Sequence, residues 1–303
     1  MKWFDRAVVS LLPLVPRPVV RRFSRPYIAG EDVDAALAAV RRLNAEGAMA
    51  TLDVLGEHIT RREQAETARD AYLSLISEIR RSGIDSNVSI KLTQIGLKLD
   101  LEFCFGNIEQ VVAHAAETGM FVRIDMEDSS CTDDTLAIFH RLRRNHGNVG
   151  VVLQAMLRRT AADAESLASL GANVRLCKGI YVEPRRLAWQ ERDIIRRNYA
   201  DTLEILLRGG SYVGIATHDE MLVWEALRLI RQLRLEPAQY EFQMLLGVEE
   251  PLRRMLIAQG HRLRVYVPFG RLWYAYSVRR LRENPRIAGY VARAVLGGRA
   301  GGT

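Results

Sequence analysis

The sequence is poor in cysteine and lacks the residue spacings that mark several classes of protein. Its 303 residues include only Cys104, Cys131 and Cys177, an odd number without C-x-x-C or Cys/His spacing. This argues against a disulfide framework and against a structural zinc site, and it favours a reducing cytoplasm. Aromatic residues make up 7% and charged residues 26%, without long single-sign runs. The composition is that of an ordinary globular protein.

Long apolar runs are also missing, although the N-terminus superficially resembles a signal peptide. Two basic residues precede the apolar run AVVSLLPLVP at residues 7–16. Pro13, Pro16 and Pro18 interrupt it before it reaches the roughly 20 apolar residues that a bilayer requires, and no A-x-A cleavage site follows. We expect an amphipathic arm that packs on the rest of the protein or rests on a membrane surface.

Signatures of nucleotide, nucleic-acid and metal binding are absent too. No G-x-G-x-x-G follows a β-rich run, and no Walker motif occurs. The 43 Lys and Arg against 36 Asp and Glu give a net charge of +7, but the arginines are spread rather than clustered, so nucleic acid is not an expected partner. Asp125, Glu127, His218 and Asp219 could nominally hold a metal, yet no metal-binding spacing supports them, and none is expected.

What the sequence does contain is a regular alternation of short β-rich runs and longer stretches with helical periodicity. The runs are residues 48–56, 87–93, 120–126, 149–155, 173–179, 212–218, 240–245 and 263–270. Strands joined by helical crossovers run parallel, and eight such units predict a closed (β/α)8 barrel of the TIM type. We expect an N-terminal helical arm over 1–47, the barrel over 48–296 and a flexible tail over 297–303.

Polar residues lie at or just beyond the C-terminal halves of these runs. They are Lys91, Asp125, Gln154, Arg175, Lys178, Thr217, His218, Gln243 and Tyr266. Barrel enzymes carry their chemistry at this end, while apolar layers fill the strand interiors, so a candidate site is expected there. Lys91 and Asp125 hold equivalent positions on neighbouring strands. They could form a structural ion pair, a catalytic pair, or a Schiff-base lysine site of the aldolase kind.

The segment AYSVRRLREN near the C-terminus places four polar side chains on one helical face. These are Tyr276, Arg279, Arg280 and Glu283, at spacings i, i+3, i+4 and i+7. The face could be a solvated stripe with an ion pair between Arg279 and Glu283. It could also be a clamp for a carboxylate, because guanidinium groups match a carboxylate in bidentate geometry.

Taken together, these segments resemble the proline dehydrogenase family, known as single-domain enzymes and as the first catalytic domain of bifunctional proline-utilisation proteins. The resemblance extends over the whole barrel. It is carried, in order, by TLDVLGE, VSIKLTQIG, VRIDMED, VVLQA, VRLCKGIY, IATHD, YEFQMLLG and VYVPFGRLWYAYSVRRLREN.

The resemblance implies oxidation of L-proline to 1-pyrroline-5-carboxylate by hydride transfer to FAD, which lies across the C-terminal ends of the strands. This is the first step of proline catabolism, and the electrons pass on to a membrane quinone. The implied location is the cytoplasm, with peripheral contact on the inner face of the membrane. Oligomeric state is left open. The aromatic Tyr266 implies a preference for proline over 4-hydroxyproline, because its ring would crowd an added hydroxyl.

Site roles follow from the resemblance residue by residue. The implied catalytic residues are Lys91, Asp125 and Arg175. The implied proline-binding residues are Lys91, Tyr181, Leu245, Tyr266, Tyr276, Arg279, Arg280 and Glu283. The implied flavin contacts are Asp125, Gln154, Arg175, Lys178, Thr217, His218 and Gln243. Asp125 would orient either Arg175 or Lys91, and it is the candidate acceptor of the amine proton.

Two other functions stay open at this point. The first is a Schiff-base aldolase on the same barrel, with Lys91 or Lys178 as the nucleophile. The second is a basic binding module for a membrane or nucleic acid, which would leave the polar strand ends unexplained.

Overall fold

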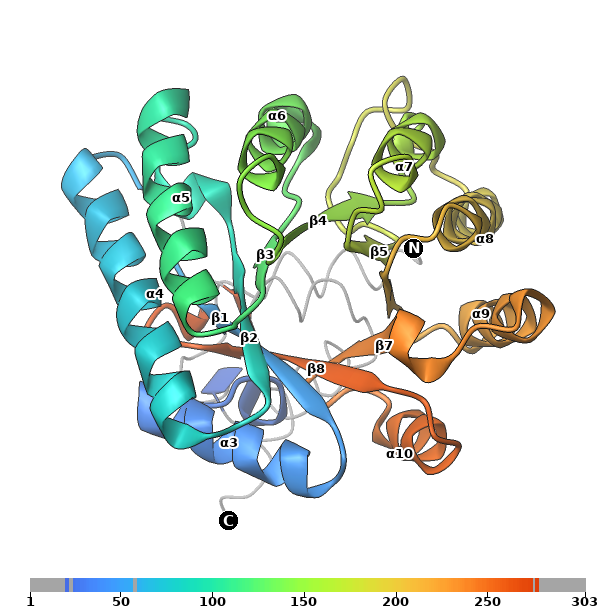
Figure 1. Ribbon diagram of the computed structural model, residues 1–303, viewed down its shortest axis with the longest axis horizontal. Coiled ribbons are helices and arrows are strands. Elements are labelled where there is room, and N and C mark those ends of the chain that lie inside the picture. The colour runs from blue at the N-terminus through green and yellow to red at the C-terminus, as the bar shows by residue number, and fades with distance from the viewer. Residues whose placement is uncertain (1–19, 22–23, 57–58, 275, 278–303) are drawn as a thin grey trace, which may run out of the picture.

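The computed structural model describes residues 20–21, 24–56, 59–274 and 276–277. Within them, eight parallel strands form a closed barrel in sequence order, as the sequence predicts, and helices surround it (Figure 1). The strands are β1 (Met49–Val54), β2 (Ser86–Ile90), β3 (Val122–Ile124), β4 (Val149–Gln154), β5 (Val174–Cys177), β6 (Val213–Ala216), β7 (Tyr240–Leu245) and β8 (Leu263–Phe269).

Amphipathic helices connect these strands and cover the outside of the barrel (Figure 1). They are α3 (Val33–Ala45), α4 (Arg62–Ser82), α5 (Leu101–Glu117), α6 (Thr132–Arg143), α7 (Thr160–Ala168), α8 (Arg192–Arg208), α9 (Glu220–Leu233) and α10 (Glu250–Ala258). Helix α3 precedes β1 and packs on β1 and β8. No helix in the described part of the chain is long and apolar enough to cross a bilayer.

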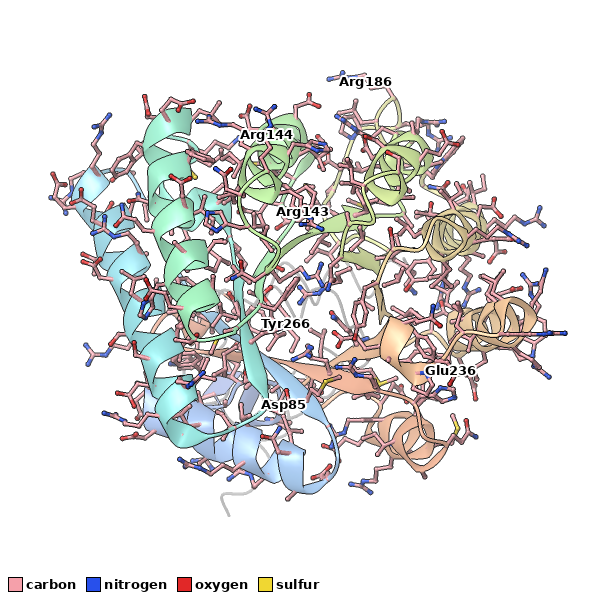
Figure 2. The ribbon with its side chains drawn as sticks, viewed as in Figure 1. Asp85, Arg143, Arg144, Arg186, Glu236 and Tyr266 are labelled. Carbon is pink, nitrogen blue, oxygen red and sulfur yellow. The ribbon has the colours of Figure 1, made fainter. Side chains whose placement is uncertain are left out.

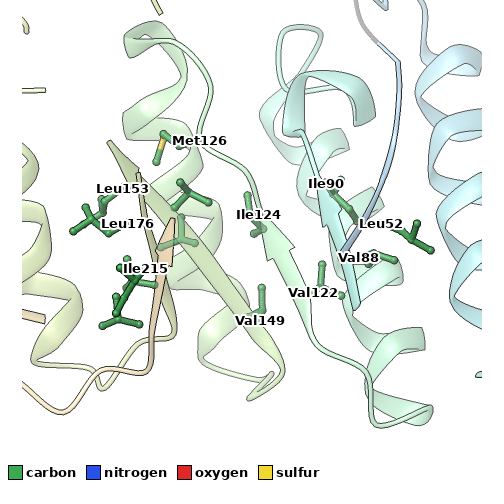
Figure 3. Close-up of a cluster of buried hydrophobic side chains, with 14 of the residues drawn as sticks. Leu52, Val88, Ile90, Val122, Ile124, Met126, Val149, Leu153, Leu176 and Ile215 are labelled. Atoms are coloured by element: carbon green, nitrogen blue, oxygen red, sulfur yellow. The ribbon is translucent and has the colours of Figure 1, made fainter. Parts of the chain in front are cut away.

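The apolar core lies largely between the sheet and these helices. It includes Leu52, Val88, Ile90, Val122 and Ile124, which are fully buried (Figure 3). Successive strand residues point to opposite faces, so the residues between them point into the barrel. There, Arg175 of β5 bonds Ser89 of β2 across the barrel at 3.1 Å.

The barrel interior therefore differs from the apolar filling expected from the sequence. Its described side chains include many polar and charged groups that pair with one another across strands. Examples are Asp53, Ser89, Arg123, Glu241 and Arg264, each less than a tenth exposed. Burying a charge is costly unless the group is paired or hydrogen-bonded. Asp53 pairs with Lys91 and Glu241 with Arg264, whereas Arg123 donates to the carbonyls of Val151 and Asn173.

The division of the chain into arm, barrel and tail stays a prediction. The eight strands fall within residues 48–296, and α3 falls within the expected arm. Residues 1–19 and 278–303 lie outside the described residues.

Candidate active site

A cavity of about 590 Å³ opens at the C-terminal ends of the strands. Every predicted site residue that the structure describes lines it, and Figure 2 shows Tyr266 inside the ring of helices while Arg186 lies at the periphery. These lining residues are Lys91, Asp125, Gln154, Arg175, Lys178, Tyr181, Thr217, His218, Gln243, Leu245, Tyr266 and Tyr276. The volume falls within the roughly 300 to 1,000 Å³ that is typical of ligand sites.

Asp125, directly after β3, is the centre of the floor of this cavity. Its Oδ1 accepts hydrogen bonds from Arg175 Nη1 and Ser89 Oγ, each at 2.6 Å. Its Oδ2 accepts one from Tyr266 at 2.9 Å and lies 3.9 Å from Lys91 Nζ. The sequence left open whether Asp125 orients Arg175 or Lys91. In the structure it contacts both, with the closer contact to Arg175.

Lys91 has a nearer partner that the sequence analysis did not identify. Its Nζ donates to Asp53 Oδ1 of β1 at 2.7 Å and to the Tyr266 hydroxyl at 3.4 Å. Burial lowers the pKa of Lys91, but the carboxylates of Asp53 and Asp125 outweigh it and hold that pKa above its ordinary value. Lys91 is therefore protonated at neutral pH, which opposes its use as a Schiff-base nucleophile.

Tyr266 of β8 completes this cluster, because its hydroxyl bonds both Asp125 Oδ2 and Lys91 Nζ. The Arg175 guanidinium lies 5.3 Å from its ring centroid, within cation–π range. Burial and the nearby carboxylates of Asp125 and Asp53 raise the pKa of Tyr266 well above its ordinary value. The hydroxyl is therefore neutral and remains a hydrogen-bond donor to Asp125.

Asp219, which follows β6, forms ion pairs with several cations at the edge of the cavity. Its Oδ2 accepts from Lys178 Nζ and from Arg196 Nε, each at 2.9 Å, and Arg192 lies 3.7 Å away. Burial alone would raise the pKa of Asp219, but Arg196 and Lys178 lower it to about 2. The pairing gives Lys178 a fixed place facing the cavity and leaves this edge with an excess of positive charge.

Gln154 at the end of β4 combines a satisfied donor with an unsatisfied acceptor. Its Nε2 donates to the carbonyl of Glu127 at 2.6 Å, whereas its buried Oε1 has no partner among the described residues. Gly179, at φ +95°, approaches closely, and a Cβ there would lie 2.9 Å from this oxygen. A buried, unpaired acceptor on the cavity wall is suited to a donor that a bound ligand supplies.

His218 and Thr217 have local hydrogen bonds that fix the rim of the cavity. The Leu245 N–H donates to His218 Nε2 at 2.9 Å, and the Asp219 N–H donates to Thr217 Oγ1 at 3.0 Å. The first bond joins the ends of β6 and β7, and the second lies within the loop that follows β6. Among the described residues, no group of His, Cys, Asp and Glu side chains is arranged to hold a metal ion.

Several residues of the site were missed by the sequence analysis, and they share one signal. Asp53, Ser89 and Glu241 all have the strand parity that points into the barrel. Ser89 and Glu241 stand two residues before a recognised site residue on the same strand. A search for polar residues at i and i+2 within each strand would have found them. Glu127 also lines the cavity, and burial raises its pKa although Thr93 donates to it.

Arg279, Arg280 and Glu283 lie outside the described residues, so their predicted clamp has no structural counterpart here. Tyr276, from the same predicted face, is described. It is 4% exposed and lines the cavity.

Comparison with known proteins places the sequence and the fold in one family. Residues 36–293 match the family model described as Proline dehydrogenase. Proline dehydrogenase of Deinococcus radiodurans is 35% identical over 302 residues, which cover 95% of this chain and 97% of that protein. Proline dehydrogenase 1 of Bacillus subtilis strain 168 is 33% identical over 273 residues, covering 90% of each.

Among solved structures, proline utilization A of Bdellovibrio bacteriovorus, inactivated by N-propargylglycine, has the same fold with a TM-score of 0.82. The identity is 24%, and the match covers 92% of this chain and 34% of that one. The chain thus spans about a third of the length of that larger protein.

Proposed function

The chain belongs to the proline dehydrogenase family, and on this premise we propose that it oxidises L-proline to 1-pyrroline-5-carboxylate with FAD as cofactor. The reaction is the first step of proline catabolism. The observation that carries the proposal is the interlocked cluster of Asp125, Arg175, Tyr266 and Lys91, which forms the floor of a cavity large enough for a ligand.

The residues around the cavity fit a flavin. Gln154 offers the unpaired buried acceptor described above, which matches a ring N–H donor. Lys178 contributes positive charge at the edge, which suits a pyrophosphate. Arg175, Gln243, Thr217, His218 and Asp125 complete the proposed flavin wall. When bound, FAD would supply the acceptor for the hydride, which carries both electrons of the oxidation.

The chain's own contribution is rigid placement of proline. Holding reacting atoms about 3 to 3.5 Å apart accounts for several kcal/mol of a barrier. We assign the proline carboxylate to Arg279 and Arg280, supported by Glu283. Lys91, Tyr181, Leu245, Tyr266 and Tyr276 would surround the ring. Tyr266 keeps its hydroxyl on Asp125, so its ring is fixed where a 4-hydroxyl on the substrate would crowd it.

Proline must lose its amine proton before it can release hydride. Both oxygens of Asp125 accept hydrogen bonds from the protein, so its primary task is to position Arg175 and Tyr266. Lys91 is protonated and cannot accept the proton. We assign water at the cavity mouth as the acceptor of the amine proton. Asp125 would stabilise the neighbouring cations Arg175 and Lys91.

We further propose that the reduced enzyme passes its electrons to a membrane quinone, from the cytoplasm and through peripheral contact of the N-terminal arm with the membrane. The support is the apolar run at 7–16 together with the net charge of +7. Removing residues 1–20 should weaken binding to anionic liposomes in a sedimentation assay. Undiminished binding would oppose this part of the proposal.

The direct test is anaerobic addition of L-proline to the FAD-loaded protein while its visible spectrum is recorded. We expect the flavin absorbance to bleach with L-proline, and to bleach much less efficiently with 4-hydroxy-L-proline. A flavin that binds but is not reduced by proline would overturn the proposed reaction. Borohydride trapping of a carbonyl substrate on Lys91 or Lys178 would instead support the aldolase alternative.

A further inference from the structure

A buried carboxylate, that of Glu241, lies in the barrel interior and does not line the cavity. Glu241 of β7 is 2% exposed. Its Oε1 accepts from Arg264 Nε at 2.9 Å and from Gln243 Nε2 at 2.5 Å, and its Oε2 accepts from the Tyr212 hydroxyl at 2.9 Å. Burial would raise the pKa of Glu241, but Arg264 and Gln243 hold it below its ordinary value, so it is ionised.

Gln243 joins this carboxylate to the active site. Its Oε1 accepts from Arg175 Nε at 2.5 Å, while its Nε2 donates to Glu241. An amide could in principle be turned either way, but a carboxylate can only accept and a guanidinium can only donate. The two charged neighbours therefore fix the orientation of the amide, and the amide fixes Arg175.

We propose that Glu241 is a positioning residue for the reaction: by holding the Gln243 amide in one orientation, it sets the place of the Arg175 guanidinium against the flavin. This inference rests on the proposed function. Without the charge of Glu241, the amide could turn its NH₂ toward Arg175, which has no acceptor to offer it, and Arg175 would have to shift.

A second role for Glu241 would be purely structural, because it also balances the charge of Arg264. The chain offers a way to separate the two roles. Gly214 of β6 pairs with Glu241 in the sheet, and a Cβ added to it would lie 2.5 Å from Gln243 Nε2. Gly214→Ala should therefore displace the amide sterically, while it leaves the pair of Glu241 and Arg264 intact.

The experiment compares Glu241→Gln and Gly214→Ala with a matched control, Tyr212→Phe. The control removes a hydrogen bond from Glu241 without touching Gln243. The readouts are the FAD affinity of the apoprotein, the reduction potential of bound flavin, and kcat and KM for L-proline. A guanidinium against the flavin favours its more electron-rich form, so a displaced Arg175 should make the potential more negative.

We expect both test variants to show a more negative potential, weaker FAD binding and a kcat lowered on the order of tenfold to a hundredfold, with a smaller change in KM. Tyr212→Phe should lower only the unfolding midpoint. If the test variants lose stability but keep the wild-type flavin potential and kcat, the proposal is overturned. If Glu241→Gln does not fold, Gly214→Ala decides by the same criteria.

The outcomes also distinguish this inference from the proposed function. The potential and the FAD affinity are measured without proline, so they test the link from Glu241 to Arg175 even if proline proves not to be the substrate. If proline bleaches the flavin of the wild-type protein and the test variants keep the wild-type potential, FAD affinity and kcat, the result would count against this inference alone. Wild-type protein that does not bind FAD would contradict both.

Discussion

Asp125 accepts hydrogen bonds at the cavity from residues of three strands, β2, β5 and β8. Each donor is fixed in turn by its own strand, so the carboxylate locks the relative positions of Arg175, Ser89 and Tyr266. A substitution at Asp125 should therefore displace these three side chains.

Replacing Asp125 with Asn keeps the shape of the side chain but leaves the Arg175 guanidinium without its carboxylate. Breaking a buried pair from one side costs about 3 to 5 kcal/mol of folding stability. Because Arg175 also loses its placement, we expect kcat/KM for proline to fall by about a hundredfold or more. Steady-state kinetics and urea unfolding test this, with Asp201→Asn on the exposed side of α8 as control. Near-normal turnover in Asp125→Asn would contradict the role given to Asp125.

Asp219 predicts a dependence of stability on pH. Its folded pKa of about 2 lies below its ordinary value of 3.8, so its ion pairs stabilise the protein fully above about pH 4 and are lost as the pH falls toward 2. The contribution is about 2 kcal/mol. The difference in unfolding free energy between wild type and Asp219→Asn should shrink to about half by pH 3. A constant difference from pH 6 to pH 3 would show that the pairs contribute nothing.

At the scale of elements, the segment between β5 and α8 carries Tyr181 over the cavity and is held at both sides. Glu183 accepts from the Ser129 N–H at 2.7 Å and from the Ser129 hydroxyl at 2.6 Å. On the outer side, Arg158 Nε donates to the Arg185 carbonyl at 2.9 Å. The segment is therefore anchored to the start of α6 and to the turn before α7.

Glu183→Ala should release the inner anchor of this segment. Two hydrogen bonds to a carboxylate are lost, so local opening should rise by about tenfold or more. We expect faster tryptic cleavage at the exposed Arg185 and Arg186 and a higher KM for proline, with little change in global unfolding. Glu165→Ala, on the exposed side of α7, is the control. Equal cleavage rates in the two variants would refute the anchoring role.

The bounds of the elements were predicted well where the hydrophobic periodicity and the residues that start or stop an element indicate the same ends. The run at 240–245 was predicted with the ends that β7 has in the structure. Strand β3 is shorter than the run 120–126, because the Met120 N–H still closes α5 on the Ala115 carbonyl. Helix α4 begins at Arg62, and the Gln64 side chain caps this end by accepting from the N–H groups of Thr60 and Arg61.

The predicted site residues that the structure describes line one cavity, but the sequence did not reveal how they pair. Residues at strand ends could be identified because all parallel strands present the same end to the mouth. The distances between strands could not, so Asp53 was missed as the partner of Lys91. The strands are also buried on both faces, so the alternation of apolar and polar residues does not show which face points into the barrel. The polar interior was missed for that reason.

For the molecule as a whole, the barrel is stabilised by two regions of different chemistry. The apolar shell between sheet and helices supplies most of the hydrophobic stabilisation. The polar interior adds specificity, since Arg264 of β8 donates to the Ala50 carbonyl of β1 at 2.6 Å where the barrel closes. We therefore expect activity to depend on the interior, while the shell supplies most of the hydrophobic stabilisation.

Phe242 of β7 tests this division. It is fully buried, and its parity is opposite to that of Glu241 and Gln243. Phe242→Ala should lower the free energy of unfolding by about 3 to 5 kcal/mol. In the fraction that remains folded, the flavin potential should be unchanged. Leu170→Ala, at 47% exposed, should change stability by less than about 0.5 kcal/mol. A shifted potential in Phe242→Ala would show that shell and interior are coupled.

The most direct test of the whole account is a crystal structure with FAD and an unreactive proline analogue bound. We predict the flavin ring against Gln154, Arg175 and Lys178, with the analogue beside Tyr266 and its carboxylate held by Arg279 and Arg280. A flavin bound away from this cavity, or Arg279 and Arg280 directed into solvent with the analogue in place, would contradict it.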